Sequence, residues 1–292
     1  MRGTQQGILL AQQGQQSIMA TMRIWGQPLR RGWWLAPALL AVVLGAFLQL
    51  TPAGLLSKVD MVGYAVCHRI PSHSFAIAGR TLPLCARCSG TFLGALTGLL
   101  GQWVVLRRRR ASEFPSLPVM AVLVALLLLM AVDGANSYLS MVIGRPLLYE
   151  PRQWLRLITG AFNGLFLSAL MAPLVNFSLW RQPSPERAIR GWRDLLVLLA
   201  LEAGMVLLVL SQWPPLLYPL ALLSGISVVT MLGLVMTVLV VMAIGRENQY
   251  DGWKETIPPL MVGFALALLM IGAIDVLRYA MTGTLEGFPG LD

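Results

Sequence analysis

The hydrophobic positions of this chain form long, nearly unbroken runs that are separated by short polar segments. A helix needs about 20 residues to cross the roughly 30 Å hydrocarbon core of a bilayer. Strands of a membrane barrel would alternate apolar and polar positions, and these runs do not. The pattern predicts an all-α, polytopic integral membrane helix bundle. The transmembrane helices are expected at Trp33–Leu50, Cys85–Leu106, Leu117–Ile143, Trp154–Leu174, Leu195–Leu210, Leu216–Ile244 and Ile257–Tyr279, which makes seven.

The composition agrees with a membrane-embedded chain. Of the 292 residues, 57% are hydrophobic and only 12% are charged, whereas a soluble domain is about one quarter charged. The formal net charge of +9 does not indicate a nucleic-acid partner. Such a partner would require a basic face with stacking aromatic residues. The densest basic cluster, Arg107–Arg110, instead follows directly after a predicted helix.

The basic residues also predict the orientation of the helices. With a cytoplasmic N-terminus, 14 of the 22 Lys and Arg residues lie in cytoplasmic segments, as the positive-inside rule favours. The C-terminus is then outside, and the cytoplasmic positive charges face anionic lipid. We therefore expect a multi-pass protein of the cell (plasma) membrane whose first partner is the lipid bilayer. The sequence does not identify a protein partner.

Three parts of the chain differ in character. Residues 1–30 are polar and rich in Gln, and we expect a flexible or interfacial segment there. Residues 31–176 hold the first four predicted helices and a Cys/His segment, 61–90, on the extracytoplasmic side. Residues 177–292 hold the last three predicted helices.

The Cys/His segment contains every cysteine and both histidines of the chain. Cys85 and Cys88 lie three residues apart at the start of the second predicted helix, so both can point in one direction. A helix N-terminus favours a thiolate, and Arg87 between the two cysteines adds to this effect. Cys67 and His68 lie at the opposite end of the segment. The cysteines could therefore act together as metal ligands or as nucleophiles.

Three kinds of chemistry fit this segment. The first is a metal site, zinc before iron, with Cys67, Cys85 and Cys88 as ligands. With His68 as the fourth ligand it is a common tetrahedral zinc set that holds the segment in place, and without a fourth ligand it keeps an open, catalytic position. An iron–sulfur cluster held by four cysteines of one chain is excluded, since the chain has three. The second is a thiol-disulfide oxidoreductase that uses Cys85 and Cys88. The third is a structural disulfide in a non-enzymatic scaffold or subunit.

Polar residues inside the third and fourth predicted helices lie near the same extracytoplasmic end. Asp133 and Asn136 share one face of the third helix, and Arg156, Thr159 and Asn163 follow a helical spacing on the fourth. Such residues usually face the interior of a bundle, because an unpaired charge in lipid costs at least ~3 kcal/mol. Arg156 could bind an anionic lipid headgroup or a small anionic substrate, with Asp133 orienting it or acting as a base. Alternatively, Asp133 and Arg156 form a structural ion pair.

The last three predicted helices carry their own ionisable residues. Glu202 lies midway along the fifth helix as a proton-handling group or as a neutral carboxylic acid. Asp275 and Arg278, three residues apart near the extracytoplasmic end of the seventh helix, either belong to the polar site or pair with each other. A transporter would need a water path to Glu202. The sequence does not decide between a catalytic and a structural role.

The motifs around the cysteines resemble a known family. "CHRIPSHSF", "PLCARCSG" and the later intramembrane "DG" and "RLITG" are similar to the hallmark of the bacterial and archaeal membrane proteins grouped as domain of unknown function 2085. The resemblance covers about residues 63–164. It implies a membrane fold and a shared residue set, but no activity. The positions that carry it are Cys67, His68, Ser74, Phe75, Gly79, Pro83, Leu84, Cys85, Arg87, Cys88, Gly90, Asp133, Gly134, Arg156, Thr159 and Gly160.

Overall fold

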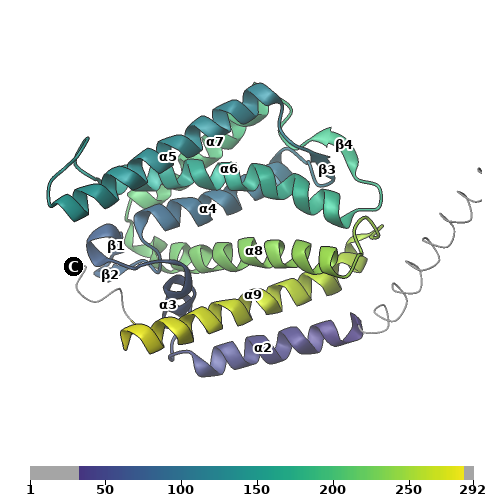
Figure 1. Ribbon diagram of the computed structural model, residues 1–292, viewed down its shortest axis with the longest axis horizontal. Helices are drawn as coiled ribbons and strands as arrows, with labels where there is room; N and C mark the ends of the chain where they lie inside the picture. Colours follow the sequence, from purple (N-terminus) through teal and green to yellow (C-terminus); the bar gives the residue numbers. More distant parts are fainter. Residues whose placement is uncertain (1–32, 286–292) are drawn as a thin grey trace, which may run out of the picture.

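The protein is a bundle of long helices with two very small strand pairs at its opposite ends (Figure 1). The computed structural model describes residues 33–285, so the polar segment predicted at 1–30 lies outside the described residues. The prediction of an all-α membrane bundle is confirmed. The long helices are α2 (Ala36–Leu50), α4 (Ala86–Leu100), α5 (Leu117–Ile143), α6 (Gln153–Leu179), α7 (Trp192–Leu210), α8 (Leu217–Ala243) and α9 (Trp253–Thr282).

Short elements connect the long helices. A twelve-residue helix follows α2, a π-helical turn continues α4, and single 3-10 turns precede α2 and α8. The strands β1 and β2 pair antiparallel, and β3 and β4 pair parallel. These short elements are η1 (Trp33–Leu35), α3 (Leu55–Val66), η2 (Pro71–His73), β1 (Ala76–Ile77), β2 (Arg80–Thr81), η3 (Gly101–Val105), β3 (Ala111–Glu113), β4 (Ser184–Arg187) and η4 (Pro214–Leu216).

Six helices of the described chain are long and apolar enough to cross a membrane. They correspond to six of the seven predicted spans, and the span predicted at Leu117–Ile143 coincides with α5. The remaining predicted span is α7, which has 19 residues. Its residues are mostly apolar, but every stretch of 18 residues in α7 includes the three charged residues Arg193, Asp194 and Glu202. The N-terminal part of α7 packs beside the start of α5 and its C-terminal part beside α3, so α7 runs along the bundle.

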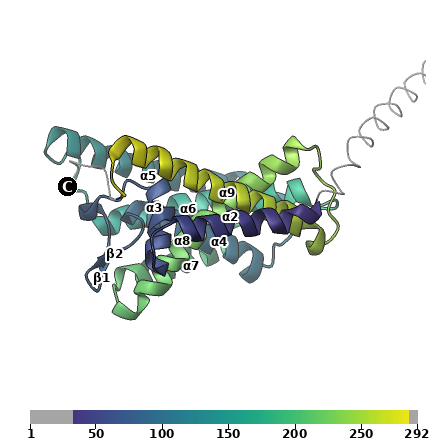
Figure 2. The ribbon, with the colours of Figure 1, turned by 90° about the horizontal axis from the view of Figure 1, so that it is seen from below.

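The centre of the bundle is the pair α4 and α6, which contact each other along their length. Helix α5 packs against α6, while α8 covers α4 from the other side and is followed by α9 (Figure 1). Helix α2 contacts α9 and lies at the edge of the bundle, as both ribbon views show (Figure 2). The first predicted span therefore packs against the last one.

The two ends of the bundle carry different short elements and ion pairs. At the arginine-rich end, where β3 and β4 pair, Arg108 forms ion pairs with Glu186 (2.9 Å) and Asp194 (3.6 Å), and Arg181 pairs with Asp251. The other end, called here the Cys/His end, carries α3, the β1–β2 hairpin and the C-terminal end of α9 (Figure 1). The predicted orientation, with the Cys/His end outside the cell, stays a prediction.

Candidate metal centre and polar site

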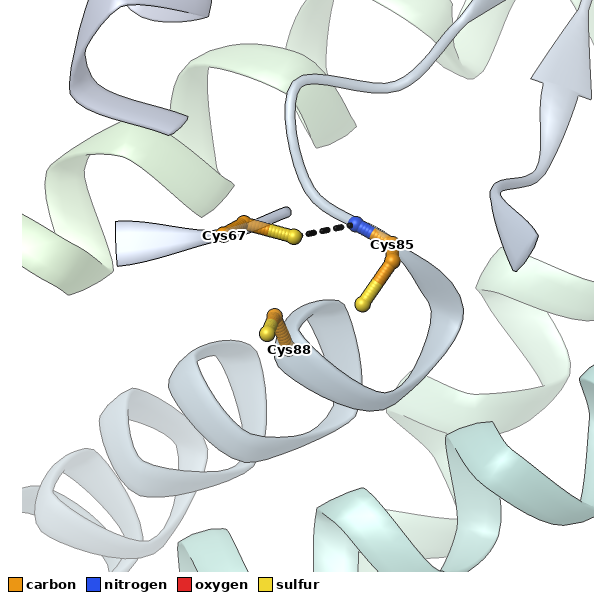
Figure 3. A group of neighbouring side chains, drawn as sticks. All are labelled: Cys67, Cys85 and Cys88. Atoms are coloured by element: carbon orange, nitrogen blue, oxygen red, sulfur yellow. Dashed lines mark hydrogen bonds between the residues drawn. The ribbon is translucent and has the colours of Figure 1, made fainter. Parts of the chain in front are cut away.

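The sulfur atoms of all three cysteines meet at the Cys/His end. They lie within 4.8 Å of one another, and Figure 3 shows the three side chains directed into one shared space. Cys67 follows the last residue of α3, Cys85 is the N-cap residue of α4, and Cys88 lies in the first turn of α4. Cys67 and Cys85 are buried, Cys88 is half-buried, and all three are free thiols. The predicted convergence of the cysteines is therefore present.

Two local features bring Cys67 close to Cys85. The strands β1 and β2 are joined by Ala78 and Gly79, which both have positive φ angles of 52° and 78°. Positive φ at both positions is typical of the tight turn of a two-residue hairpin, so the chain reverses within the segment. In addition, Gly63 of α3 lies directly against Pro83, whose carbonyl oxygen would be 2.1 Å from any Cβ at position 63. The end of α3 therefore reaches the start of α4.

The cluster is arranged around the sulfur of Cys67. The backbone N–H of Cys85 donates a hydrogen bond to Sγ of Cys67 at 3.2 Å (Figure 3). Hydrogen bonds from the Cys85 and Cys88 thiols and from His68 lower the pKa of Cys67. In turn, the bond to Cys67 raises the pKa of Cys85 to about 12. The hydrogen bonds that converge on Sγ of Cys67 favour the thiolate form of this side chain.

The two histidines of the segment lie together beside the cluster. Nε2 of His68 is 3.4 Å from Nδ1 of His73, and the rings are nearly perpendicular. His68 is not part of the group of atoms within 4.8 Å, but its side chain hydrogen-bonds to Cys67. Burial, followed by the nearby charge of Arg156, lowers the pKa of His73 to about 4. His73 is therefore neutral at pH 7, and its Nδ1 can accept a hydrogen bond from Nε2–H of His68.

Arg278 of the last helix fastens the end of α3. Its guanidinium donates hydrogen bonds to the backbone carbonyls of Tyr64, Cys67 (2.6 Å) and His68 (3.4 Å), and lies 4.1 Å over the ring of Tyr64. The C-terminal carbonyls of a helix are strong acceptors for a cation, so these bonds stabilise the end of α3. The expected pairing of Arg278 with Asp275 stays a prediction.

Asp133 is the centre of a hydrogen-bond network between α4, α5 and α6. The carboxylate accepts hydrogen bonds from Arg87, from the hydroxyl of Tyr149 (2.9 Å) and from Thr159 (3.3 Å). Its ion-pair partner is Arg87 rather than Arg156. Arg87 extends from the first turn of α4, between two of the cysteines. Asp133 is 1% exposed, so every oxygen of the carboxylate is used inside the protein.

The loop after α5 is tied to this network. The side-chain amide of Asn136 donates to the carbonyl of Tyr149 (3.0 Å) and accepts from the N–H of Leu148 (2.9 Å). Ser140 accepts a hydrogen bond from the N–H of Leu147 at 3.2 Å. These bonds fold the α5–α6 loop back over the end of α5, which brings Tyr149 to Asp133.

Arg156 is buried but lines a pocket. Its side chain is 6% exposed, and its Nε lies 3.5 Å from the hydroxyl of Ser137. The pocket has a volume of about 400 Å³. It opens between the α5–α6 loop and the Cys/His segment, and its lining residues are Ser72, His73, Ser137, Ser140, Met141, Gly144, Arg145, Pro146, Pro151 and Arg156.

Three predicted site residues lie outside the cluster and its network. Asn163 bonds only to Thr91 of α4, at 3.4 Å. Glu202 lies against Gly94 of α4, six residues or about 9 Å beyond Cys88 along the helix. Both carboxylate oxygens of Glu202, and Oδ1 of Asp275, are buried without a hydrogen-bond partner in the described part of the chain. The structure does not join these carboxylates to the polar site.

Sequence reasoning missed two residues of the site. Tyr149, which donates to Asp133, lies in a loop whose position depends on the bonds of Asn136. Arg145 is an exposed loop residue that lines the pocket with Arg156. Neither stands on a periodic helix face, so no spacing signal points to it. His73, interpreted from the sequence as an ordinary loop histidine, contacts both His68 and the pocket.

The fold and the site define an all-helical membrane protein with a three-cysteine cluster at one end of its bundle. The family model described as "Predicted membrane protein (DUF2085)" matches residues 67–170. An uncharacterised protein of Methanocaldococcus jannaschii is 32% identical over 109 residues, which cover 37% of this chain and 63% of that relative. An uncharacterised protein of Methanothermobacter thermautotrophicus is 30% identical over 116 residues, or 39% and 91% of the two chains. The chain belongs to this family, and no solved structure matches it.

Proposed function

We propose that Cys67, Cys85 and Cys88 bind one metal ion, zinc before iron, at the extracytoplasmic surface of the cell membrane. The observation that carries this proposal is the convergence of three free thiols within 4.8 Å. A tetrahedral site with zinc–sulfur bonds of about 2.3 Å holds its sulfurs about 3.8 Å apart. The cluster therefore needs a contraction of about 1 Å at most to surround an ion.

His68 is the best candidate for the fourth ligand. A metal-bound histidine usually donates its second ring N–H to a fixed acceptor, which sets the ring orientation. In this protein Nε2 of His68 faces Nδ1 of His73, and the His68 side chain also reaches Cys67. If Nδ1 of His68 binds the metal, Nε2–H can donate to Nδ1 of His73 while the ring stays beside Cys67. The resulting site of three cysteines and one histidine is closed, as structural zinc sites are.

The function that this geometry supports best is a metal clamp between the end of α3 and the start of α4. Such a clamp would fix the polar residues of α4 on the extracytoplasmic side. A catalytic role for Asp133 stays a prediction. The structure favours a positioning role, because Arg87, Tyr149 and Thr159 already occupy the Asp133 carboxylate.

The test is elemental mass spectrometry of the full chain purified in detergent, together with a thiol count before and after denaturation. We expect about one zinc or iron per chain and three thiols that react only after denaturation or chelation. Cys67→Ser and Cys88→Ser should each lose the metal. Thr81→Ser, an exposed change in the same segment, should keep it. Co²⁺ substitution should give sulfur-to-metal charge-transfer absorption, and His68→Ala should alter that spectrum.

Metal-free protein with three reactive thiols would refute the proposal. A disulfide in the purified protein would instead favour one of the two alternatives. If Cys85 and Cys88 form a pair that a dithiol reduces and an oxidant restores, the thiol-disulfide oxidoreductase is supported. The half-buried position of Cys88 is the observation in favour of that alternative. A disulfide that resists reduction in the folded protein would indicate a structural role.

A further inference from the structure

We infer that the pocket beside the cluster is a binding site for a phosphate-type anion, carried either by a lipid headgroup or by a free phosphate compound. This inference goes beyond the metal site and does not depend on a bound metal. The pocket, of about 400 Å³, is lined by His73, which also contacts His68. Its ligand would approach from the Cys/His end of the bundle.

The charge of the pocket selects an anion. Arg156 and Arg145 both line it, and no Asp or Glu is among its lining residues. Arg156 is 94% buried, and no ion pair neutralises it in the described part of the chain. The nearest carboxylate, Asp133, already forms its ion pair with Arg87. A buried guanidinium that faces a cavity without a local counter-charge is an established way to bind a phosphate or carboxylate.

Hydroxyl groups in the pocket can add hydrogen bonds to the same ligand. Ser137 accepts hydrogen bonds from Arg87 and Arg156, and Ser140 accepts one from the N–H of Leu147. A hydroxyl has one O–H to donate besides two lone pairs. Both hydroxyls are therefore available as donors, and Ser72 supplies a third. Two guanidinium groups and three hydroxyls suit a tetrahedral anion with several acceptor oxygens better than a single carboxylate.

The rim of the pocket carries apolar side chains that can lie at the membrane surface. Met141 and Pro146 line the pocket, and the neighbouring side chains of Ile143, Leu147 and Leu148 are 48%, 51% and 67% exposed. Apolar side chains at the end of a membrane helix lie where lipid tails meet headgroups. An anion attached to an acyl chain could therefore place its tail along this rim. A free phosphate compound would use the guanidinium and hydroxyl groups without contacting this rim.

Calorimetric titration of the full chain in nonionic detergent tests the inference with three probes. These are inorganic phosphate, dioctanoyl phosphatidylglycerol and dioctanoyl phosphatidylcholine. We expect phosphatidylglycerol to bind and phosphatidylcholine, whose headgroup has no net charge, to bind at least tenfold more weakly. Binding of inorganic phosphate as well would show that the anion alone is recognised. Binding of phosphatidylglycerol without inorganic phosphate would assign the site to a lipid headgroup.

Three variants make the test specific. Arg156→Gln should weaken binding by about tenfold or more, the usual size of a hydrogen-bonded charge contact, and Arg156→Lys should restore part of it. Arg152→Gln removes an exposed charge one helical turn away, outside the pocket, and should bind as the unmodified chain does. If Arg156→Gln does not fold, the exposed Arg145→Gln tests the same pocket.

Several results would overturn the inference. The inference fails if no anionic probe binds at millimolar concentration, or if the two lipids bind equally. It also fails if the pocket variants bind as the unmodified chain does, or if Arg152→Gln loses as much affinity as Arg156→Gln. Each titration is repeated after chelation. A metal-free protein that still binds the anion would leave this inference intact while the metal proposal fails.

Discussion

The close approach of α4 and α6 gives a sharp prediction about Gly160. An ideal Cβ at this position would lie 2.3 Å from the backbone carbonyl oxygen of Arg87 and 3.1 Å from the backbone nitrogen of Thr91. Gly164, one turn further along, is equally close to the backbone of α4. Small residues that let two backbones meet are the usual interface of membrane helices. Gly160→Ala should therefore force the two helices apart.

The size of the effect follows from these distances. Ordinary contact begins at about 3.4 Å, so the helices must separate by about 1 Å at this point. The obstacle is backbone, which no change of rotamer can remove, and overpacking of this kind costs roughly 1–3 kcal/mol. Alanine in place of a helical glycine recovers about 0.5–1 kcal/mol. We expect a net loss of about 1 kcal/mol in the free energy of unfolding.

The assay is equilibrium unfolding in mixed micelles, with intrinsic tryptophan fluorescence as the signal. Gly272→Ala is the matched control, because Gly272 is also inside a long helix but has no atom within 4 Å of an added Cβ. The control should be as stable as the unmodified chain or slightly more stable. If Gly160→Ala and Gly272→Ala unfold within about 0.5 kcal/mol of each other, the described contact between α4 and α6 is wrong.

Two further predictions concern the ion and hydrogen-bond partners of the site. Arg278→Gln removes the donors that hold the end of α3, so alkylation of Cys67 in the metal-free protein should become about tenfold faster. Arg152→Gln, an exposed change at the same end, should leave the rate unchanged, and equal rates in both variants would contradict the role of Arg278. Asp133→Asn leaves Arg87 without its carboxylate partner and should lower the free energy of unfolding by about 3 kcal/mol. In the same unfolding assay, the double variant Asp133→Asn/Arg87→Met should recover part of this loss. A double variant no more stable than Asp133→Asn would refute the pairing.

The long helices could be predicted from the sequence because hydrophobic runs of this length have few alternatives in a membrane. The predicted ends were less accurate where proline occurs. Helix α6 continues through Pro173 to Leu179, and α9 begins at Trp253, before Pro258 and Pro259. Neighbouring membrane helices satisfy the backbone groups that a proline leaves free. Helix α3 was not predicted, because its twelve residues are too few to span a bilayer.

The candidate site was predicted only as far as local spacing reaches. Cys85 and Cys88 share a helical turn, so their proximity follows from the sequence. The ion-pair partner of Asp133 could not be chosen from the sequence, because Arg87 and Arg156 both lie on neighbouring helices at a suitable depth. Which of them faces Asp133 depends on the relative rotation of α4 and α6, and the glycine contacts between these helices fix that rotation. No spacing rule within one helix carries this information.

The pairing of Arg87 with Asp133 also explains why the pocket retains a positive charge. Asp133 is the one acid within α5, and its carboxylate is fully used by Arg87, Tyr149 and Thr159. Arg156 remains buried next to this neutral pair, with the hydroxyl of Ser137 as its hydrogen-bond acceptor. A buried charge without a counter-charge lowers stability. Within the bundle such a residue is expected where a ligand supplies the opposite charge, so the network that neutralises Arg87 supports the anion site that we propose at Arg156.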